Sequence, residues 1–561
     1  MNKITGSEAL LKTLIAEGVD CIFGYPGGQA IPIYDKLYDY KEKLRHVLVR
    51  HEQGATHAAQ GYARVSGKVG VVVVTSGPGA TNTVTGVADA MLDSTPLVVI
   101  SGQVPSPLLG TDAFQEVDVI GIMLPITKWA YQVRRAEDIV WAVSRAFYIA
   151  STGRPGPVVI DFSKDAQTDL LDYIYKPVDY IRSYRPWPTL EPDRIQEAAT
   201  LINKAKRPFA LVGQGVILSG AEQELMMFLD KADIPAGSTM LGLSAMPSDY
   251  RLNKGLLGMH GNIGPNRKTN ECDVLIAIGM RFDDRVTGNV NTYARQAKVI
   301  HMDIDLSEMD KNVKTDVKVL GNAKDTLCEI TKLLKPVKHT KWIDSFRADE
   351  REELTKVIEK EIHPVGGSLR MGEVVRKVSE ATAHEAVLVT DVGQNQVMSA
   401  RYFKFSKTRS IITSGGLGTM GFGLPASIGA KIGAPDRKIC LFVGDGGIQM
   451  TLQELGTIMQ EQLDIKIILL NNQYLGMVRQ WQELFFEERY SFTGMKNPDF
   501  VTLAKAFHIG AKAVNEREEL EDAISEMLNY QGAFLLVVNV EKCGIVYPMV
   551  PAGGCITNML Y

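Results

Sequence analysis

Short, almost wholly apolar runs recur along this chain, and each is followed by a turn rich in glycine or polar residues and then by a helical pattern. Residues 69–75 and 439–443 are two such runs. Strands that are apolar on both faces are typical of parallel sheets covered by helices. The alternation therefore predicts an α/β fold made of doubly wound parallel-sheet domains.

The runs fall into three regions, which we predict to be domains at residues 1–170, 191–338 and 366–540. A stretch around 170–190 rich in Tyr, Pro and Arg lies between the first two, and a charged helical stretch at 342–361 precedes the third. We expect the charged stretch to be a solvated connector, and residues 541–561 to be an irregular tail. The first and third regions share an order of helix, strand, glycine turn, helix and strand. This order indicates two copies of one architecture around a different α/β domain.

Composition argues against several other classes of protein. The 561 residues are 45% hydrophobic and 22% charged, with a formal net charge of −4, so no nucleic-acid partner is expected. Six cysteines are scattered without a CxxC pair, which favours a reducing, cytoplasmic location over a disulfide framework or a zinc site. Apolar runs stay far below the ~20 residues that span a bilayer, so we expect no membrane partner.

One stretch, residues 444–472, combines this strand, turn and helix pattern with residues that could bind a ligand. An apolar run leads into Gly444-Asp445-Gly446-Gly447, a helical pattern follows, and a second apolar run ends at Asn472. Because the C-terminal ends of parallel strands meet at one sheet edge, Asp445 and Asn472 face one another there if the two strands are neighbours. Their oxygens suit Mg²⁺, and the glycines let backbone N–H groups approach a phosphate. The alternative is a plain turn and a strand terminator.

With Glu52 after a strand of the first region, this unit resembles thiamine-diphosphate-dependent decarboxylases and carboligases, in which the GDG…NN segment holds Mg²⁺ and the diphosphate. Essentially the whole chain is similar to the catalytic subunits of acetohydroxyacid synthases (acetolactate synthases). The block RFDDRVTG at 281–288 marks the FAD-containing biosynthetic members rather than the flavin-free catabolic ones. The other matching motifs lie at 25–28, 50–54, 110–116, 153–157, 258–261, 415–421 and 476–481.

The resemblance implies a thiamine diphosphate site built from the first and third regions. Glu52 is expected to share a proton with the aminopyrimidine ring; the alternative is a helix cap. Asp445, Asn472 and the backbone carbonyl of Tyr474 are expected to hold Mg²⁺. Many relatives carry His in place of Asn395 and Ser or Ala near Gly446-Gly447, which leaves one phosphate contact open. The other expected contacts with thiamine diphosphate are Tyr25, Pro26, Val392, Gly393, Gln394, Asn395, Gly418, Met420, Gly444, Gly446, Gly447 and Met477.

The resemblance also implies where the 2-oxoacid binds. Gly28, Gln115 and Lys164 are expected to be catalytic, and the backbone N–H of Gly28 could face a developing oxyanion. Phe114, Arg285 and Trp481 are expected to contact substrate. Lys164 and Arg285 could instead form surface ion pairs, and Trp481 could be core.

A flavin site is expected in the middle region. Gly213 and Gly215 follow a strand there, but Gly220 falls too late for a GxGxxG motif, so this signal alone is weak. The flavin is expected to be structural, because the net reaction transfers no electrons. The residues expected to contact FAD are Gly213, Gly215, Met259, His260, Gly261, Arg281, Asp283, Arg285, Asp303 and Ile304.

The expected enzyme decarboxylates pyruvate and ligates the hydroxyethyl unit to pyruvate or 2-oxobutanoate, in branched-chain amino-acid biosynthesis. Its expected cofactors are thiamine diphosphate, Mg²⁺ and FAD. The family implies a homodimer or tetramer with active sites shared between subunits, and a separate regulatory small subunit. A pyruvate oxidase and a non-catalytic relative stay open as rivals, whereas Glu52 argues against glyoxylate carboligase, which lacks this residue.

Overall fold

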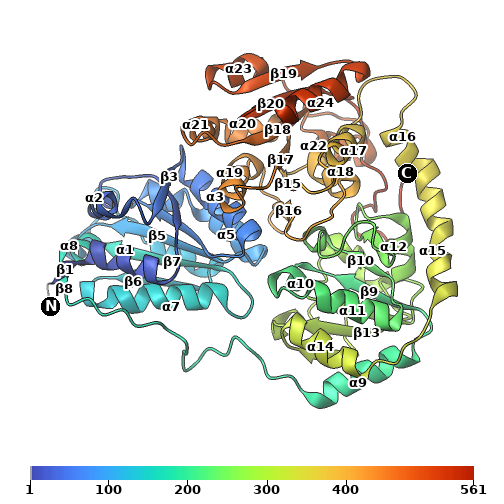
Figure 1. The fold of residues 1–561 in the computed structure, drawn as a ribbon, viewed down its shortest axis with the longest axis horizontal. Coiled ribbons are helices and arrows are strands. Elements are labelled where there is room, and N and C mark those ends of the chain that lie inside the picture. Colours follow the sequence, from blue (N-terminus) through green and yellow to red (C-terminus); the bar gives the residue numbers. More distant parts are fainter. Residues whose placement is uncertain (1–2) are drawn as a thin grey trace.

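The computed structural model describes residues 3–561 and contains three parallel six-stranded sheets (Figure 1). The first sheet has the order β3-β2-β4-β5-β7-β6, and its buried strand β4 lies in the middle, as the apolar run predicted. A two-stranded antiparallel sheet, β1 with β8, joins the two ends of this region. The strands are β1 (Ile4–Thr5), β2 (Cys21–Gly24), β3 (Arg45–Leu48), β4 (Gly70–Val74), β5 (Leu97–Gln103), β6 (Trp129–Val133), β7 (Pro157–Ser163) and β8 (Leu170–Leu171). The main helices are α1 (Gly6–Ala16), α2 (Ile31–Tyr40), α3 (Glu52–Ser66), α5 (Val84–Leu92) and α7 (Ile139–Ser151).

The second sheet has the order β11-β10-β9-β12-β13-β14. Numbered from its own first strand this is 3-2-1-4-5-6, the order of dinucleotide-binding folds, whose ligands lie where the strand order reverses, here between β9 and β12. Its strands are β9 (Pro208–Val212), β10 (Ala236–Ser238), β11 (Asn253–Leu256), β12 (Val274–Ile278), β13 (Lys298–Asp303) and β14 (Val317–Leu320). Its helices include α9 (Pro192–Lys204), α10 (Gln214–Leu218), α11 (Glu222–Ala232), α12 (Ile263–Thr269), α13 (Asp284–Thr287) and α14 (Ala323–Leu333).

The third sheet, β16-β15-β17-β18-β20-β19, repeats the strand order of the first. The predicted pair of similar architectures around a different α/β domain is therefore confirmed. Its strands are β15 (Val387–Thr390), β16 (Ile411–Ile412), β17 (Ile439–Gly444), β18 (Ile465–Asn471), β19 (Gly510–Val514) and β20 (Phe534–Asn539). Its helices include α17 (Met371–Ala381), α18 (Gln394–Tyr402), α19 (Gly423–Gly433), α20 (Asp445–Met450), α21 (Leu455–Gln460), α22 (Gly476–Phe485), α23 (Phe500–Ala506) and α24 (Leu520–Asn529).

Helices α3 and α19 pack the first and third regions together in the middle of the molecule (Figure 1). Glycines allow the close approach. A Cβ atom on Gly61 would lie 2.8 Å from the carbonyl carbon of Ala426, and one on Gly429 would lie 2.8 Å from the backbone nitrogen of Tyr62. Residues 54–65 of α3 are all buried. The two similar sheets thus share one hydrophobic core.

The charged stretch before the third region is only partly the solvated connector that we expected. It forms α15 (Thr340–Glu353), a π-helical turn (Leu354–Ile358) and α16 (Glu359–Ile362). One face buries Trp342 and Phe346 against the second sheet. Glu353, 3% exposed, forms an ion pair of 2.6 Å with Arg401. Among the helices of residues 3–561, none is both long enough and apolar enough to cross a membrane.

Glu361, on α16, gives the folded chain a pH dependence. Burial raises the pKa of Glu361 from 4.5 to about 7, although the N–H of Gly372 donates to its carboxyl at 2.8 Å. Because the folded-state pKa is the higher one, stability falls as the pH rises from about 4.5 to 7. We expect Glu361→Gln to stabilise the protein by about 3 kcal/mol at pH 8 and much less at pH 5.

The measurement is the thermal midpoint of both proteins at the two pH values. Glu359→Gln, an exposed residue of the same helix, is the matched control and should change neither midpoint. An equal shift at pH 5 and pH 8 would show that ionisation of Glu361 is not the cause.

Candidate active site

The third sheet brings Asp445 and Asn472 together at one edge. Strands β17 and β18 are hydrogen-bonded neighbours, with Gly444 paired to Leu470, so the condition in our prediction is met. Both side chains are buried, at 1% and 3% exposure. The backbone N–H of Tyr474 donates to Asn472 Oδ1 at 3.1 Å, which places the third predicted ligand next to the second.

This pair suits a hard cation with a mixed ligand set. A carboxylate, an amide oxygen and a backbone carbonyl, completed by phosphate oxygens and water, match the preferences of Mg²⁺. Residues 3–561 hold no group of three or more His, Cys, Asp or Glu side chains placed for a metal. A site with one carboxylate does not need such a group. Burial raises the pKa of Asp445, and the hydrogen bond from Asn497 opposes this rise.

Asn497 is a neighbour of this pair that the sequence did not reveal. Its Nδ2 donates to Asp445 Oδ2 at 2.6 Å and to Asn471 Oδ1 at 2.9 Å. Gln449 Nε2 in turn donates to Asn497 Oδ1 at 3.1 Å. Asn497 lies in the irregular segment before α23, where no periodicity marks it. The amide holds the carboxylate of Asp445 in one orientation.

The turns after β15 and β17, together with Gly418 of the loop after β16, form a glycine-lined cradle where the strand order of the third sheet reverses. Gly393 and Gly418 have φ angles of 117° and 70°, which residues with a Cβ rarely adopt. Gln394 Oε1 accepts a hydrogen bond from Asn472 Nδ2 at 3.3 Å. Asn395 Oδ1 is buried without a hydrogen-bond partner among residues 3–561, so it is free to contact a bound group. The cradle fits a diphosphate held through a metal ion.

Close packing explains why glycines occupy positions 446 and 447. A Cβ atom on Gly447 would lie 2.8 Å from the carboxyl carbon of Asp391. That carboxylate accepts hydrogen bonds from the backbone N–H groups of Gly421 and Gly423. A Cβ atom on Gly446 would lie 3.6 Å from the methyl carbon of Met420, which places Met420 beside this turn. A larger residue at position 447 would displace Asp391.

The first sheet carries the second group of predicted residues, in the segments that follow β2, β3, β5 and β7. Glu52 is the first residue of α3, and Asn82 Nδ2 donates to its Oε2 at 2.9 Å. The residue that caps α3 is His51, whose ring nitrogen accepts from the N–H of Gln53 at 3.2 Å. The helix-cap alternative for Glu52 is therefore wrong.

Four of the residues predicted to contact the 2-oxoacid, Gly28, Phe114, Gln115 and Lys164, lie at this end of the sheet. Lys164 Nζ donates to the carbonyl of Gly28 at 3.4 Å. Gln115 has a φ of 61° and lies against Gly77, at whose position a Cβ would be 2.9 Å from the Gln115 carbonyl oxygen. Phe114 is 84% exposed. An exposed phenylalanine beside these polar groups is available to contact another molecule.

A cavity of about 730 Å³ is lined mainly by the second and third regions, and Leu92, Ser94, Ser151, Gly153, Arg154 and Pro155 of the first region complete its wall. Gly213 and Gly261 do not line it; they serve close backbone packing, since a Cβ on Gly213 would lie 2.6 Å from Met280 Cα. The cavity begins where the second sheet reverses its strand order and ends at the glycine cradle. The predicted flavin contacts in its wall are Gly215, Met259, His260, Arg281, Asp283, Arg285, Asp303 and Ile304, and the predicted thiamine and substrate contacts are Val392, Gly393, Gly418, Met477 and Trp481.

The charged groups of this cavity have different surroundings. Burial raises the pKa of Asp303 to about 7, against a hydrogen bond of 2.9 Å from the N–H of Asp305. Asp283 caps α13 by accepting from the N–H groups of Arg285 and Val286, each at 3.1 Å. The Arg285 side chain is 60% exposed and lies 3.7 Å from Asp284. Arg285 is thus free to reach a ligand at the mouth of the cavity.

The predicted residues of the first sheet belong to a different surface. None of them lines the 730 Å³ cavity, whereas Val392, Gly393, Gly418, Met477 and Trp481 of the third region do. The predicted residues of the first region that are missing from the cavity wall are Tyr25, Pro26, Gly28, Glu52, Phe114, Gln115 and Lys164, and those of the third region are Gln394, Asn395, Met420, Gly444, Asp445, Gly446, Gly447, Asn472 and Tyr474.

The sequence matches three consecutive families that describe one class of enzyme. Residues 4–122 match the N-terminal TPP binding domain of thiamine pyrophosphate enzymes, residues 195–330 their central domain, and residues 391–538 their C-terminal TPP binding domain. These matches fall on the three sheets in order, although the first ends before β6 and β7 and the third begins just after β15. The fold and the site thus define a thiamine diphosphate-dependent enzyme.

Similarity over the full length narrows this class. The chain is 44% identical over 551 residues to the acetolactate synthase large subunit of Lactococcus lactis, covering 98% of this chain and 95% of the relative. It is 43% identical over 565 residues to the acetolactate synthase isozyme 2 large subunit of Escherichia coli, covering 99% of each. A probable acetolactate synthase large subunit of Methanocaldococcus jannaschii is 43% identical over 567 residues, covering 99% of this chain and 95% of the relative. The chain belongs to the family of acetolactate synthase large subunits, which confirms the resemblance seen in its motifs.

Proposed function

We propose that this chain is the catalytic subunit of an acetolactate synthase. It decarboxylates pyruvate and joins the remaining two-carbon unit to a second 2-oxoacid. Pyruvate as acceptor gives 2-acetolactate, and 2-oxobutanoate gives 2-aceto-2-hydroxybutanoate, in the first common step towards valine, leucine and isoleucine. The observation that supports this proposal most strongly is the full-length similarity to acetolactate synthase large subunits.

The third sheet would hold the anionic end of the cofactor. Asp445, Asn472 and the carbonyl of Tyr474 would bind Mg²⁺ and, through it, the diphosphate. Thiamine diphosphate, when bound, would supply the carbon nucleophile and the electron sink that decarboxylation of a 2-oxoacid needs. The apolar and glycine-lined wall around Gly393, Gly418 and Met477 would exclude water from this step.

Glu52 would move the proton that activates the cofactor. Asn82 orients its carboxyl through Oε2, and Oε1 lies on the side of Gly79. This carboxyl would hold a proton against a ring nitrogen of the bound pyrimidine, a kind of general acid–base assistance that is typically worth ~10²–10⁴-fold in rate. Lys164 and the backbone N–H of Gly28 would bind the carboxylate and the developing oxyanion of the 2-oxoacid.

The separation of the two groups of residues in one chain supports a site shared by two copies. Glu52, Gly28 and Gln115 of one copy would face the glycine cradle of the other. We therefore infer a homodimer or a tetramer. The relatives are named large subunits, and we infer a separate small regulatory subunit as a further partner.

The cavity lined mainly by the second and third regions supports a flavin site. Its polar groups, Arg281, Asp283 and Asp303, lie at the ends of strands of a sheet with dinucleotide-binding order. We infer that FAD binds there and has a structural role, because acetolactate formation transfers no net electrons. A pyruvate oxidase would use the same cavity for redox chemistry.

The test of the proposed function is an assay of the purified protein with pyruvate, thiamine diphosphate, Mg²⁺ and FAD. We expect acetolactate to form, to fall to background when EDTA removes Mg²⁺, and to be joined by 2-aceto-2-hydroxybutanoate when 2-oxobutanoate is added. Oxygen consumption in place of acetolactate would identify a pyruvate oxidase. Binding of thiamine diphosphate without any product would identify a non-catalytic relative.

Asn497 offers a test of the proposed metal site. Asn497→Ala removes the hydrogen bond that orients Asp445. A hydrogen bond to a charged group is worth about 1.5–3 kcal/mol, so the Mg²⁺ concentration that half-saturates thiamine diphosphate binding should rise at least ~10-fold. Calorimetric titration of thiamine diphosphate at varied Mg²⁺ measures this. Unchanged Mg²⁺ dependence would place the metal away from Asp445.

A further inference from the structure

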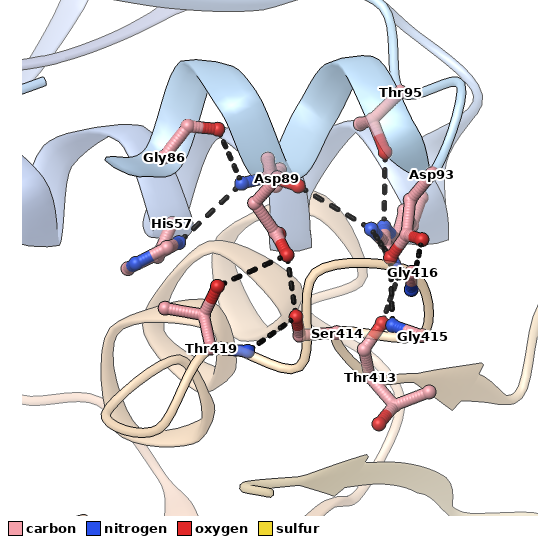
Figure 2. A network of polar contacts seen from close by, with 12 residues as sticks. His57, Gly86, Asp89, Asp93, Thr95, Thr413, Ser414, Gly415, Gly416 and Thr419 are labelled. Carbon is pink, nitrogen blue, oxygen red and sulfur yellow. Dashed lines mark hydrogen bonds and ion pairs between the residues drawn. The ribbon is translucent and has the colours of Figure 1, made fainter. Parts of the chain in front are cut away.

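A loop of the third region, residues 413–419, is held by charged residues of the first region (Figure 2). The loop follows β16 and leads to α19. Ser414 to Gly418 line the cavity described above, and Gly418 is a predicted thiamine diphosphate contact. The charged residues are Asp89 on α5, its C-terminal cap Asp93, and Arg64 on α3. The contacts that hold this loop in place therefore also hold part of the cofactor site in place.

Asp93 makes two hydrogen bonds to the backbone of the loop. Its Oδ2 accepts from the N–H of Gly415 at 2.8 Å, and its Oδ1 accepts from the N–H of Gly416 at 2.7 Å. Arg64 pairs with Oδ2 at 2.8 Å and also donates to the carbonyl of Thr413. The side chains of Asp93 and Arg64 are 0% and 6% exposed. A buried carboxylate with a guanidinium and two N–H donors has its charge fully satisfied, so loss of the carboxylate leaves several buried groups without partners.

Asp89, one turn earlier on α5, holds the other part of the loop. The hydroxyl groups of Ser414 and Thr419 both donate to Asp89 Oδ1. The backbone N–H of Thr419 donates to Ser414 Oγ at 2.8 Å, which closes the loop on itself (Figure 2). Burial and the nearby charge of Asp93 raise the pKa of Asp89 to about 6. At pH 7–8 this carboxyl is therefore ionised and accepts both hydroxyl groups.

Gly416 lies where the three regions meet. A Cβ atom at this position would be 3.0 Å from Asp93 Oδ1, 3.0 Å from Leu92 Cβ and 3.3 Å from the Arg281 guanidinium. Two residues later, a Cβ on Gly418 would be 3.9 Å from Val392. A shift of the loop would therefore disturb the cavity wall on the flavin side and on the thiamine side together.

We propose that Asp93, held by Arg64, is a positioning residue for both cofactor sites. Its carboxylate fixes loop 413–419 so that the loop can contact thiamine diphosphate on one side and the flavin cavity on the other. The proposal rests on the proposed function, because it takes the cavity and the cradle as the sites of these two cofactors. Asp93 itself touches neither group.

The test is cofactor binding by Asp93→Asn. The amide keeps the shape of the side chain but loses the charge and one of the two acceptor oxygens. The half-saturating concentrations of thiamine diphosphate with Mg²⁺ and of FAD should each rise about 10- to 100-fold. Calorimetry measures the first and flavin fluorescence the second. At saturating cofactors, kcat for acetolactate should stay within about 3-fold of wild type, because no group that meets substrate has changed.

Asp138→Asn is the matched control. It removes an Asp–Arg pair of 2.9 Å at the start of a helix in the same region, at an exposed arginine, and should change neither cofactor affinity. Ser414→Ala is the milder second variant, which removes one donor to Asp89 and the acceptor for Thr419, and should weaken both cofactors about 3- to 10-fold. If Asp93→Asn does not fold, the cofactor affinities of Ser414→Ala test the positioning role instead.

The outcomes separate this proposal from the proposed function. A folded Asp93→Asn protein with a lower thermal midpoint but unchanged affinity for both cofactors would overturn the positioning role. Loss of affinity for only one cofactor would overturn the claim that one loop serves both. If wild type binds both cofactors but makes no acetolactate, the proposed function fails, while parallel weakening of both cofactors by Asp93→Asn would still support the positioning role.

Discussion

Replacing Glu52 by glutamine is expected to lower the rate of acetolactate formation by about 10²–10⁴-fold while the protein stays folded. Glutamine keeps the size of the side chain and an oxygen that can accept from Asn82. It cannot share a proton with a pyrimidine ring nitrogen, so this acid–base assistance would be lost. The measurements are kcat at saturating pyruvate and cofactors, the thermal midpoint and the affinity for thiamine diphosphate.

Glu42→Gln, an exposed carboxylate of the same region, serves as the control and should keep full activity. A Glu52→Gln enzyme with near-normal kcat would remove Glu52 from the mechanism. Since His51 and not Glu52 caps α3, a large loss of activity with an unchanged thermal midpoint could not be assigned to a weakened helix.

Replacing Gly429 by alanine is expected to destabilise the protein by about 3 kcal/mol. The new methyl group would lie 2.6 Å from the carbonyl carbon of Ala58 and 2.8 Å from the backbone nitrogen of Tyr62, so it meets backbone that cannot rotate away. Helices α3 and α19 would have to separate. The expected fall in the thermal midpoint is roughly 2–4 °C, measured by calorimetry with yield of soluble protein as a second readout.

Gly264→Ala is the matched substitution, because Gly264 is also a helical glycine but its added methyl group would make only ordinary contacts of 3.4 Å or more. It should leave the thermal midpoint unchanged or raise it, since alanine has the higher helix propensity. A Gly429→Ala protein as stable as Gly264→Ala would mean that the two helices tolerate a wider separation than the structure has.

The central strands could be predicted from the sequence because they are buried on both faces and read as unbroken apolar runs, as β4 and β12 do. Strand β6 gives no such run, because four of its five residues, Trp129–Val133, are only partly buried at the sheet edge. Strand β14 alternates buried and half-buried residues over four positions, which is too short for a clear period. The stretch at 342–361 was predicted to be a solvated connector because it is rich in charged residues. One face of its helix is nevertheless buried, and on that face Glu353 forms an ion pair with Arg401.

Within the candidate site, the sequence reveals residues whose spacing along one βαβ unit fixes their position. Asp445 and Asn472 follow neighbouring strands, so topology brings them together. Asn497 and Asp93 follow no such rule. Asp93 meets Gly416 across 323 residues of chain, and only the packing of two domains creates that contact. A residue that positions others across a domain boundary has no characteristic local sequence pattern from which its role could be predicted.

The crossing of α3 and α19 also has a consequence for how the protein is made. Arg64 on α3 and Thr413, just before α19, are 349 residues apart in the chain. Ribosomes add about 5–20 residues per second, so α3 emerges roughly 20–70 s before its partner helix exists. During that interval the newly made first region exposes an apolar, glycine-containing helix face that other nascent chains or chaperones can bind. The yield of soluble protein therefore depends on the rate of synthesis and on chaperone supply as well as on the stability of the finished fold.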